Sequence, residues 1–213
     1  MRKHRSIRRI LASATAFATV FSCCYAYGAY TGTVENSSVV VSAAYGVCGE
    51  GTTDDNYQYA VYYDYDGVGS DYCIIQGYSG TDAELVIPSA VTYDGTEIPV
   101  TEIKQEAFRD NTAITSVTIP EGVTSIGQKA FSGCTALTDV SLPKSLQEIG
   151  VDAFEKCPVK SILISGDLTS GQYAFDSDAL ETITFADGVT TIPEYTFRYM
   201  ENLKTVHFSD TIT

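Results

Sequence analysis

A near-duplicated stretch between residues 114 and 154 constrains the fold of this chain more than any other feature. The segment ITSVTIPEGVTSIGQKAF is followed by SGCTALTDVSLPKSLQEIGVDAF, and apolar, proline, glycine and cysteine positions recur 23 residues apart. The matched pairs are Ile114/Leu137, Val117/Val140, Ile119/Leu142, Val123/Leu146, Ile126/Ile149, Phe131/Phe154, Pro120/Pro143, Gly127/Gly150, Ala130/Ala153 and Cys134/Cys157. A fixed period of about 20 to 30 residues is typical of solenoids, so we predict a stack of coils.

An Ala-Phe or Thr-Phe pair marks the same point in every copy. The phenylalanines are Phe108, Phe131, Phe154, Phe175 and Phe197, at intervals of 23, 23, 21 and 22 residues. The short interval falls where Ser165-Gly166-Asp167 replaces the usual proline turn. The repeat array is therefore expected to run from 104 to 213, with the last copy incomplete.

The residue pattern within each copy predicts a coil with three sides. Thr138–Leu142 alternates polar and apolar residues, which favours a short strand that a proline then ends. Ser145–Ile149 predicts a second short strand, and Gly150 offers a bend with positive φ. Val151–Phe154 is long enough for one helical turn. Because one coil buries too few apolar side chains to offset its conformational entropy, stability must come from stacking, and we predict a right-handed β-rich solenoid of about 22 to 23 residues per coil.

The pattern L-x-x-V-x-L-P-x-x-L-x-x-I-G-x-x-A-F-x-x-C resembles the BspA-like leucine-rich repeats of bacterial cell-surface and secreted proteins. The resemblance covers about Leu85 to Thr213, and the two central copies match it almost completely. It implies a leucine-rich-repeat solenoid in a surface or secreted bacterial protein that acts as an adhesin or binding module. It implies no catalytic residues.

The N-terminus has the features of a secretory signal peptide. Five basic residues precede the apolar run from Ile10 to Phe21, and Cys24-Tyr25-Ala26 offers a cleavage site, so residues 1–26 are expected to be removed. The run is shorter than a membrane span requires. Cleavage leaves eight basic against 27 acidic residues, a formal charge of −19, which argues against nucleic-acid partners. We expect a secreted or cell-surface protein without a membrane span after cleavage.

A cap is expected between the leader and the array. Residues 27–56 are rich in small residues and predict a flexible lead-in, whereas residues 57–103 predict an N-terminal β-hairpin cap with a degenerate first repeat. Its strands are Tyr57–Tyr63 and Tyr72–Tyr78, and Tyr93–Thr96 carries an Asp-Gly turn. Seven tyrosines between Tyr57 and Tyr78 favour cap packing, and a sugar-stacking platform is the alternative.

The cysteines suggest one bridge and one pair of thiols. Cys48 and Cys73 flank the first strand of the cap, and a disulfide between them is plausible in an exported protein. Cys134 and Cys157 occupy equivalent positions on adjacent coils, where parallel side chains favour two buried thiols. Neither a zinc-ligand pattern nor any cofactor motif is present in the sequence.

Catalysis has little support. His207 is the only histidine outside the leader, and no serine or cysteine lies in a nucleophile motif. We therefore predict a non-catalytic protein without a cofactor.

The outward residues of the first strand in each copy form the candidate ligand-binding strip. Stacked at one strand spacing, they should make a flat strip of hydroxyl groups with an acid, an aliphatic and a histidine side chain. These residues are Ser116, Thr118, Asp139, Ser141, Ser161, Leu163, Thr182, Thr184, Thr205 and His207.

Three functional hypotheses remain open at this point. The first is an extracellular binding or adhesion module with a protein or glycan ligand on the strip. The second is a structural spacer, or a fragment, that presents a downstream domain of a larger surface protein. The third is carbohydrate binding by the tyrosine-rich cap. The chain is expected to be a monomer or to associate end to end through its open last coil.

Overall fold

The computed structural model describes residues 34–35, 38–39, 47–63, 69–175, 178–197 and 200–210. The predicted signal peptide, much of the lead-in to residue 56 and residues 211–213 lie outside these ranges. The described residues form strands and turns without an α-helix. They accordingly contain no helical segment of the length and hydrophobicity that crossing a bilayer requires.

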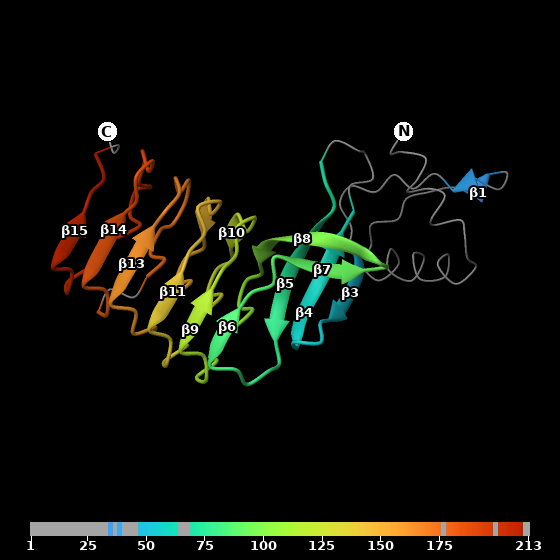
Figure 1. Ribbon diagram of the computed structural model, residues 1–213, viewed down its shortest axis with the longest axis horizontal. Coiled ribbons are helices and arrows are strands. Elements are labelled where there is room, and N and C mark those ends of the chain that lie inside the picture. The colour runs from blue at the N-terminus through green and yellow to red at the C-terminus, as the bar shows by residue number, and fades with distance from the viewer. Residues whose placement is uncertain are drawn as a thin grey trace.

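Six short parallel strands build one side of a solenoid, along which they follow one another in Figure 1. The register aligns equivalent residues: Val117 pairs with Leu85 and Val140, and Ile183 pairs with Ile162 and Val206. One repeat therefore makes one coil, as the period predicts. Hydrogen bonds join the first three of these strands into one sheet and the last three into another. We call the two together the first sheet. Its strands are β6 (Glu84–Val86), β9 (Ser116–Thr118), β11 (Asp139–Ser141), β13 (Ser161–Ile164), β14 (Thr182–Phe185) and β15 (Thr205–His207).

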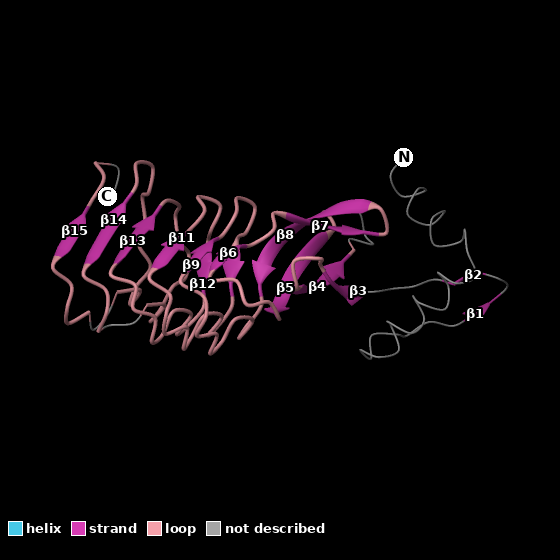
Figure 2. Ribbon diagram, turned by 60° about the horizontal axis from the view of Figure 1, so that its bottom comes forward, coloured by secondary structure: helices cyan, strands magenta, loops and turns pink. Residues whose placement is uncertain are grey.

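A second sheet covers the opposite side and continues into the cap (Figure 2). The strand order is β12–β10–β8–β5–β4–β3, and the pairs from β12 to β5 are parallel. The pairs β5–β4 and β4–β3 are antiparallel, which confirms the predicted hairpin. The strands are β3 (Val47–Thr52), β4 (Tyr57–Tyr62), β5 (Tyr72–Tyr78), β8 (Thr96–Ile103), β10 (Ser125–Ile126) and β12 (Glu148–Ile149).

Two smaller antiparallel pairs complete the strands. Strand β7 (Ala90–Tyr93) pairs with β8 across a turn in which Asp94 and Gly95 have φ of 49° and 71°. Two consecutive positive φ values are those that an Asp-Gly hairpin turn requires, so the predicted turn is confirmed. Strands β1 (Val34–Glu35) and β2 (Ser38–Val39) form a separate two-stranded sheet.

The third side of each coil consists of turns, and the predicted helical turn is wrong. In the second coil, Lys129 and Gly133 flank Phe131 with φ of 55° and 79°. These left-handed residues direct alternate N–H groups along the solenoid axis, and the N–H of Phe131 donates to Ala153 O of the next coil at 2.8 Å. A helix would satisfy the same groups within one coil. The turns therefore add a third hydrogen-bonded ladder between coils.

Glycine recurs at one position of the repeat, and the structural reason is not the predicted bend. Neither Gly127 nor Gly150 has a positive φ. A Cβ on Gly150 would overlap the backbone N of Gln128 and lie 2.7 Å from its Cα, and a Cβ on Gly127 would lie 2.8 Å from the Cα of Gln105. Glycine is required here because adjacent coils approach each other closely.

Stacked phenylalanine rings run through the core. Ring centroids are 4.8 Å apart for Phe108–Phe131, 5.2 Å for Phe131–Phe154 and 5.4 Å for Phe154–Phe175, with planes within 6° of parallel. Two cap tyrosines, Tyr57 and Tyr78, contact Phe108 at centroid distances of 6.5 and 6.2 Å. The hairpin therefore covers the first coil, as a solenoid end requires.

Candidate functional site

All ten predicted strip residues lie on the outer face of the first sheet. The register pairs Ser116 with Asp139 and Thr118 with Ser141. In the last three coils it aligns Ser161–Thr182–Thr205 and Leu163–Thr184–His207. The predicted arrangement is confirmed, because strand residues alternate between faces and the intervening side chains fill the core. Ligand binding by the strip stays a prediction.

The strip extends one coil further than the sequence analysis placed it. Glu84 and Val86 of β6 align with Ser116 and Thr118, and Val86 is 65% exposed. They fall outside the regular repeat spacing because the β7–β8 hairpin lengthens the first coil. The sequence signal that could have placed Glu84 and Val86 on the strip was Leu85–Pro88, whose apolar pattern already indicated a strand in the first coil. We call the ten residues together with Glu84 and Val86 the strand face.

The strand face offers contacts of several kinds. Most of its side chains are hydroxyls, and Leu163 is 49% exposed among them. The Thr138 hydroxyl donates to the Asp139 carboxylate at 2.6 Å, which orients that acid on the surface. Such a surface suits hydrogen bonds and van der Waals contacts with a partner. It brings together no nucleophile, base and orienting acid of the kind that catalysis would use.

A short charged column borders the strand face at its C-terminal end. Lys204 Nζ lies 2.7 Å from Glu181 Oε2, one coil away. The hydrogen bond from Lys204 and its positive charge hold the pKa of the Glu181 carboxyl below its usual value. Lys160 is the exposed residue at the equivalent position on the preceding coil. Both signs of charge are therefore present beside Leu163 and His207.

Cys134 and Cys157, at equivalent positions of adjacent coils, have buried thiol groups. Cys134 Sγ donates to Phe108 O at 3.1 Å, and Cys157 Sγ donates to Phe131 O at 3.1 Å. Both are buried and neither forms a disulfide, which confirms the predicted pair of buried thiols. A small polar side chain at this point of the repeat thus satisfies a turn carbonyl of the preceding coil.

The structure argues against the predicted bridge between Cys48 and Cys73. Cys73 is a free and fully buried thiol, and burial raises its pKa to about 12. Strand β4 lies between β3, which contains Cys48, and β5, which contains Cys73. Two strand spacings separate such positions by about 9.6 Å, beyond the roughly 7 Å that a disulfide can span between Cα atoms.

The tyrosines of the cap mostly pack against one another and the core. Tyr57 and Tyr59 are buried, and the Tyr57 hydroxyl donates to Val86 O at 2.8 Å. Tyr62 and Tyr72 stack face to face with centroids 5.0 Å apart and planes within 5°. Each ring therefore uses one of its faces internally, which favours the packing role over a sugar-stacking platform. Tyr65 lies outside the described residues.

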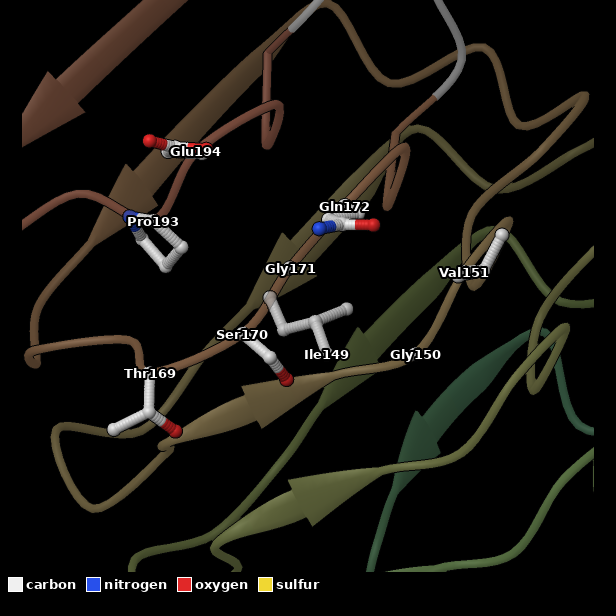
Figure 3. A pocket seen from close by; sticks show the side chains of 9 residues that line it. All are labelled: Ile149, Gly150, Val151, Thr169, Ser170, Gly171, Gln172, Pro193 and Glu194. Atoms are coloured by element: carbon white, nitrogen blue, oxygen red, sulfur yellow. The ribbon is translucent and has the colours of Figure 1, made fainter.

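A groove of about 390 Å³ opens on the other side of the solenoid (Figure 3). It spans three consecutive coils near the C-terminal end of the second sheet. No motif or repeat position in the sequence indicated a site here. The lining residues are Ile149, Gly150, Val151, Thr169, Ser170, Gly171, Gln172, Pro193 and Glu194. Nowhere in the described part of the chain, the groove included, is a group of three or more histidine, cysteine or acidic side chains arranged to hold a metal ion.

Comparisons with known proteins agree with this geometry. The model of the BspA type leucine rich repeat region matches residues 101–213, with six copies. No curated protein matches the chain.

Two solved structures are similar in fold. A leucine rich cell surface protein from Faecalibacterium prausnitzii A2-165 is 28% identical with a TM-score of 0.57, over 78% of this chain and 44% of that protein. A leucine rich repeat protein from T. pallidum is 27% identical with a TM-score of 0.53, over 73% of this chain and 81% of that protein. The chain spans less than half the length of the first of these. With six matched copies covering more than half of its residues, the chain belongs to the BspA-type leucine-rich repeat family.

Proposed function

We propose that this protein is a non-catalytic binding or adhesion module that acts outside a bacterial cell, with a protein ligand on the strand face. The observation that carries the proposal is the alignment of outward side chains within two three-stranded sheets, which follow one another along one side of the solenoid. Repeat proteins bind along such extended surfaces. The similar cell-surface protein from Faecalibacterium prausnitzii supports a surface or secreted location.

A protein ligand fits the strand face better than a glycan does. Val86 and Leu163 are exposed aliphatic side chains among hydroxyls, and charges of both signs lie at the C-terminal end of the strand face, which contains Leu163. The described residues of the strand face include no aromatic side chain other than the His207 ring, so a sugar would find no tyrosine or tryptophan surface to stack on. A partner surface with apolar and polar groups interleaved would complement this arrangement.

The first prediction tests the strand face with a charge-matched pair of variants. Beads coated with the protein are applied to a layer of reconstituted basement-membrane extract, and the retained beads are counted under flow. Thr118→Arg with Leu163→Arg should reduce retention at least tenfold, because two large cations then occupy exposed positions of the strand face. Gln105→Arg with Gln147→Arg, both exposed on other sides, should retain the unaltered level.

The alternative outcomes separate the hypotheses. Equal loss in both pairs would show that net charge, and not the strand face, controls retention. Equal retention in both pairs would move the binding surface elsewhere. Beads of the unaltered protein that are retained no better than uncoated beads would favour the spacer role over the adhesion role.

A further inference from the structure

The groove on the second side of the solenoid exists because the repeat is interrupted there. In the second and third coils, Gly127 and Gly150 lie against the backbone of the preceding coil. At the equivalent Gly171, a Cβ would instead meet the Thr196 side chain at 3.2 Å and Leu168 at 3.8 Å. The fourth coil is two residues short, and the fifth has Pro193 in the glycine position. The coils are therefore no longer in close backbone contact at this corner.

The hydrogen bonds between the turns of adjacent coils change register at the same place. Lys129 N–H donates to Val151 O at 3.1 Å, and Val151 lies three residues before its phenylalanine. One coil further on, Asp152 N–H donates to Tyr173 O at 3.1 Å, and Tyr173 lies two residues before its phenylalanine. The pairing before the phenylalanine thus slips by one residue at the coil boundary over which the groove opens, and the register is regular again at Phe154, whose N–H donates to Ala174 O at 2.8 Å. The groove is a consequence of the sequence and not of a loop conformation.

Three side chains at equivalent repeat positions line the groove along the solenoid axis. Val151, Gln172 and Glu194 each lie three residues before the phenylalanine of their coil. Figure 3 shows them on three successive segments, with Pro193 beside Glu194 and Ile149 between Ser170 and Gly150. At one strand spacing per coil, the row from Val151 to Glu194 is about 10 Å long. Along this row the side chain changes from aliphatic at Val151 to amide at Gln172 and carboxylate at Glu194.

The charges around the groove select a cation. Glu194 is the one charged side chain among the nine residues that line it. The exposed Glu148 pairs with Ser170 at its edge, which places a second carboxylate nearby. Lys129, on the neighbouring coil, is already paired with Asp152 at 3.8 Å. In a chain with a formal charge of −14, the field of the whole molecule adds to this local preference.

From this geometry we infer that the groove binds a lysine or arginine side chain presented by a basic segment of a partner protein. The aliphatic stem lies over Val151, which is 39% exposed, and over Pro193. The cationic group reaches the Glu194 carboxylate, and Gln172 accepts a further hydrogen bond through its amide oxygen. Long basic side chains combine these two needs, because their stems bury against apolar surface while the charge stays accessible. This site lies away from the strand face and is independent of the proposed function.

Small probes test the inference directly. The full chain, labelled with ¹⁵N, is titrated with Nα-acetyl-lysine methylamide while amide chemical shifts are followed. Saturable shifts at Gly150, Gly171 and Gln172 are expected, with a dissociation constant in the millimolar range. Glu194→Gln should weaken binding at least fivefold, while Glu201→Gln, an exposed acid outside the groove, should leave it unchanged. The spectrum of each variant also reports whether its fold is intact.

Two neutral probes define the results that would overturn the inference. Nα-acetyl-lysine methylamide with an acetylated Nε has the same stem without the charge and should bind at least fivefold more weakly. Saturable shifts at the same amides with methyl α-glucoside, and none with the lysine probe, would make the groove a sugar site. Weak, non-saturating shifts spread over the acidic surface would show that the lysine probe recognises net charge alone.

Discussion

Replacing Phe131 with alanine is expected to lower the free energy of unfolding by about 3–5 kcal/mol. The Phe131 ring is fully buried and is stacked between Phe108 and Phe154 at centroid distances of 4.8 and 5.2 Å. Its removal leaves a cavity in the middle of the ladder, and the neighbouring coils cannot close it because three hydrogen-bonded ladders fix their separation. Urea denaturation followed by circular dichroism measures the change.

Phe208 provides the matched control for this prediction. It stacks on Phe185 with centroids 5.7 Å apart, but 63% of its surface is exposed. Phe208→Ala should therefore cost no more than about 1 kcal/mol, since little of the ring is removed from water. If Phe131→Ala costs no more than Phe208→Ala, the stacked rings do not form the core that holds the coils together.

The second large effect is expected from Gly150→Ala. The added methyl group would overlap the backbone of Gln128 in the preceding coil, and backbone cannot yield as a flexible side chain can. We expect a loss of about 3 kcal/mol, at the upper end of what overpacking costs. Differential scanning calorimetry of the variant beside the unaltered protein measures it.

Gly171→Ala tests whether glycine is needed at this repeat position in every coil, or only where the backbones of two coils lie close together. The new methyl group there would meet only side-chain atoms, with Thr196 nearest at 3.2 Å, so no backbone has to move. The expected loss is below about 1 kcal/mol, because neither overlap with backbone nor a positive φ opposes the substitution. Equal losses at the two glycines would contradict the proposed cause of the groove.

The repeat period predicted the stacking because it is a global property of the sequence. Matching Val117 with Val140 by sequence alone already implies that they pair, and the parallel register confirms it. The outward position of Thr118 and Ser141 then follows from strand alternation. The cap hairpin and the Asp94–Gly95 turn were predictable for a different reason, since each depends on a short local pattern.

Features that depend on contacts between coils were not predictable in this way. Lys129 and Asp152 adopt a left-handed conformation that costs roughly 1–2 kcal/mol each and has no signature in their side chains. The hydrogen bonds that the turns make to the next coil offset this cost. The sequence pattern favoured a helical turn because the carbonyl groups that accept these hydrogen bonds belong to the next coil and cannot be identified from one repeat alone.

The two candidate sites differ in the same way, because one follows from patterns in the sequence and the other depends on contacts between coils. The strand face was predictable because alternation and period together place each of its side chains. The groove depends on a two-residue deletion and on Pro193 in a glycine position, whose effect appears only when three coils are stacked. The hypothesis of a bridge between Cys48 and Cys73 relied on their closeness to the same hairpin, whereas the distance between them depends on the strand order β5–β4–β3, which the sequence pattern does not give.

The stacking of the coils can be measured directly from contacts between phenylalanine rings. In a nuclear Overhauser spectrum of protein with protonated phenylalanine rings in a deuterated background, cross-peaks should connect Phe108 with Phe131, Phe131 with Phe154 and Phe154 with Phe175. Phe108 and Phe154, two coils apart, should show none. A spectrum without the cross-peak between Phe131 and Phe154 would contradict the stacked solenoid and, with it, the strand face as a continuous binding surface.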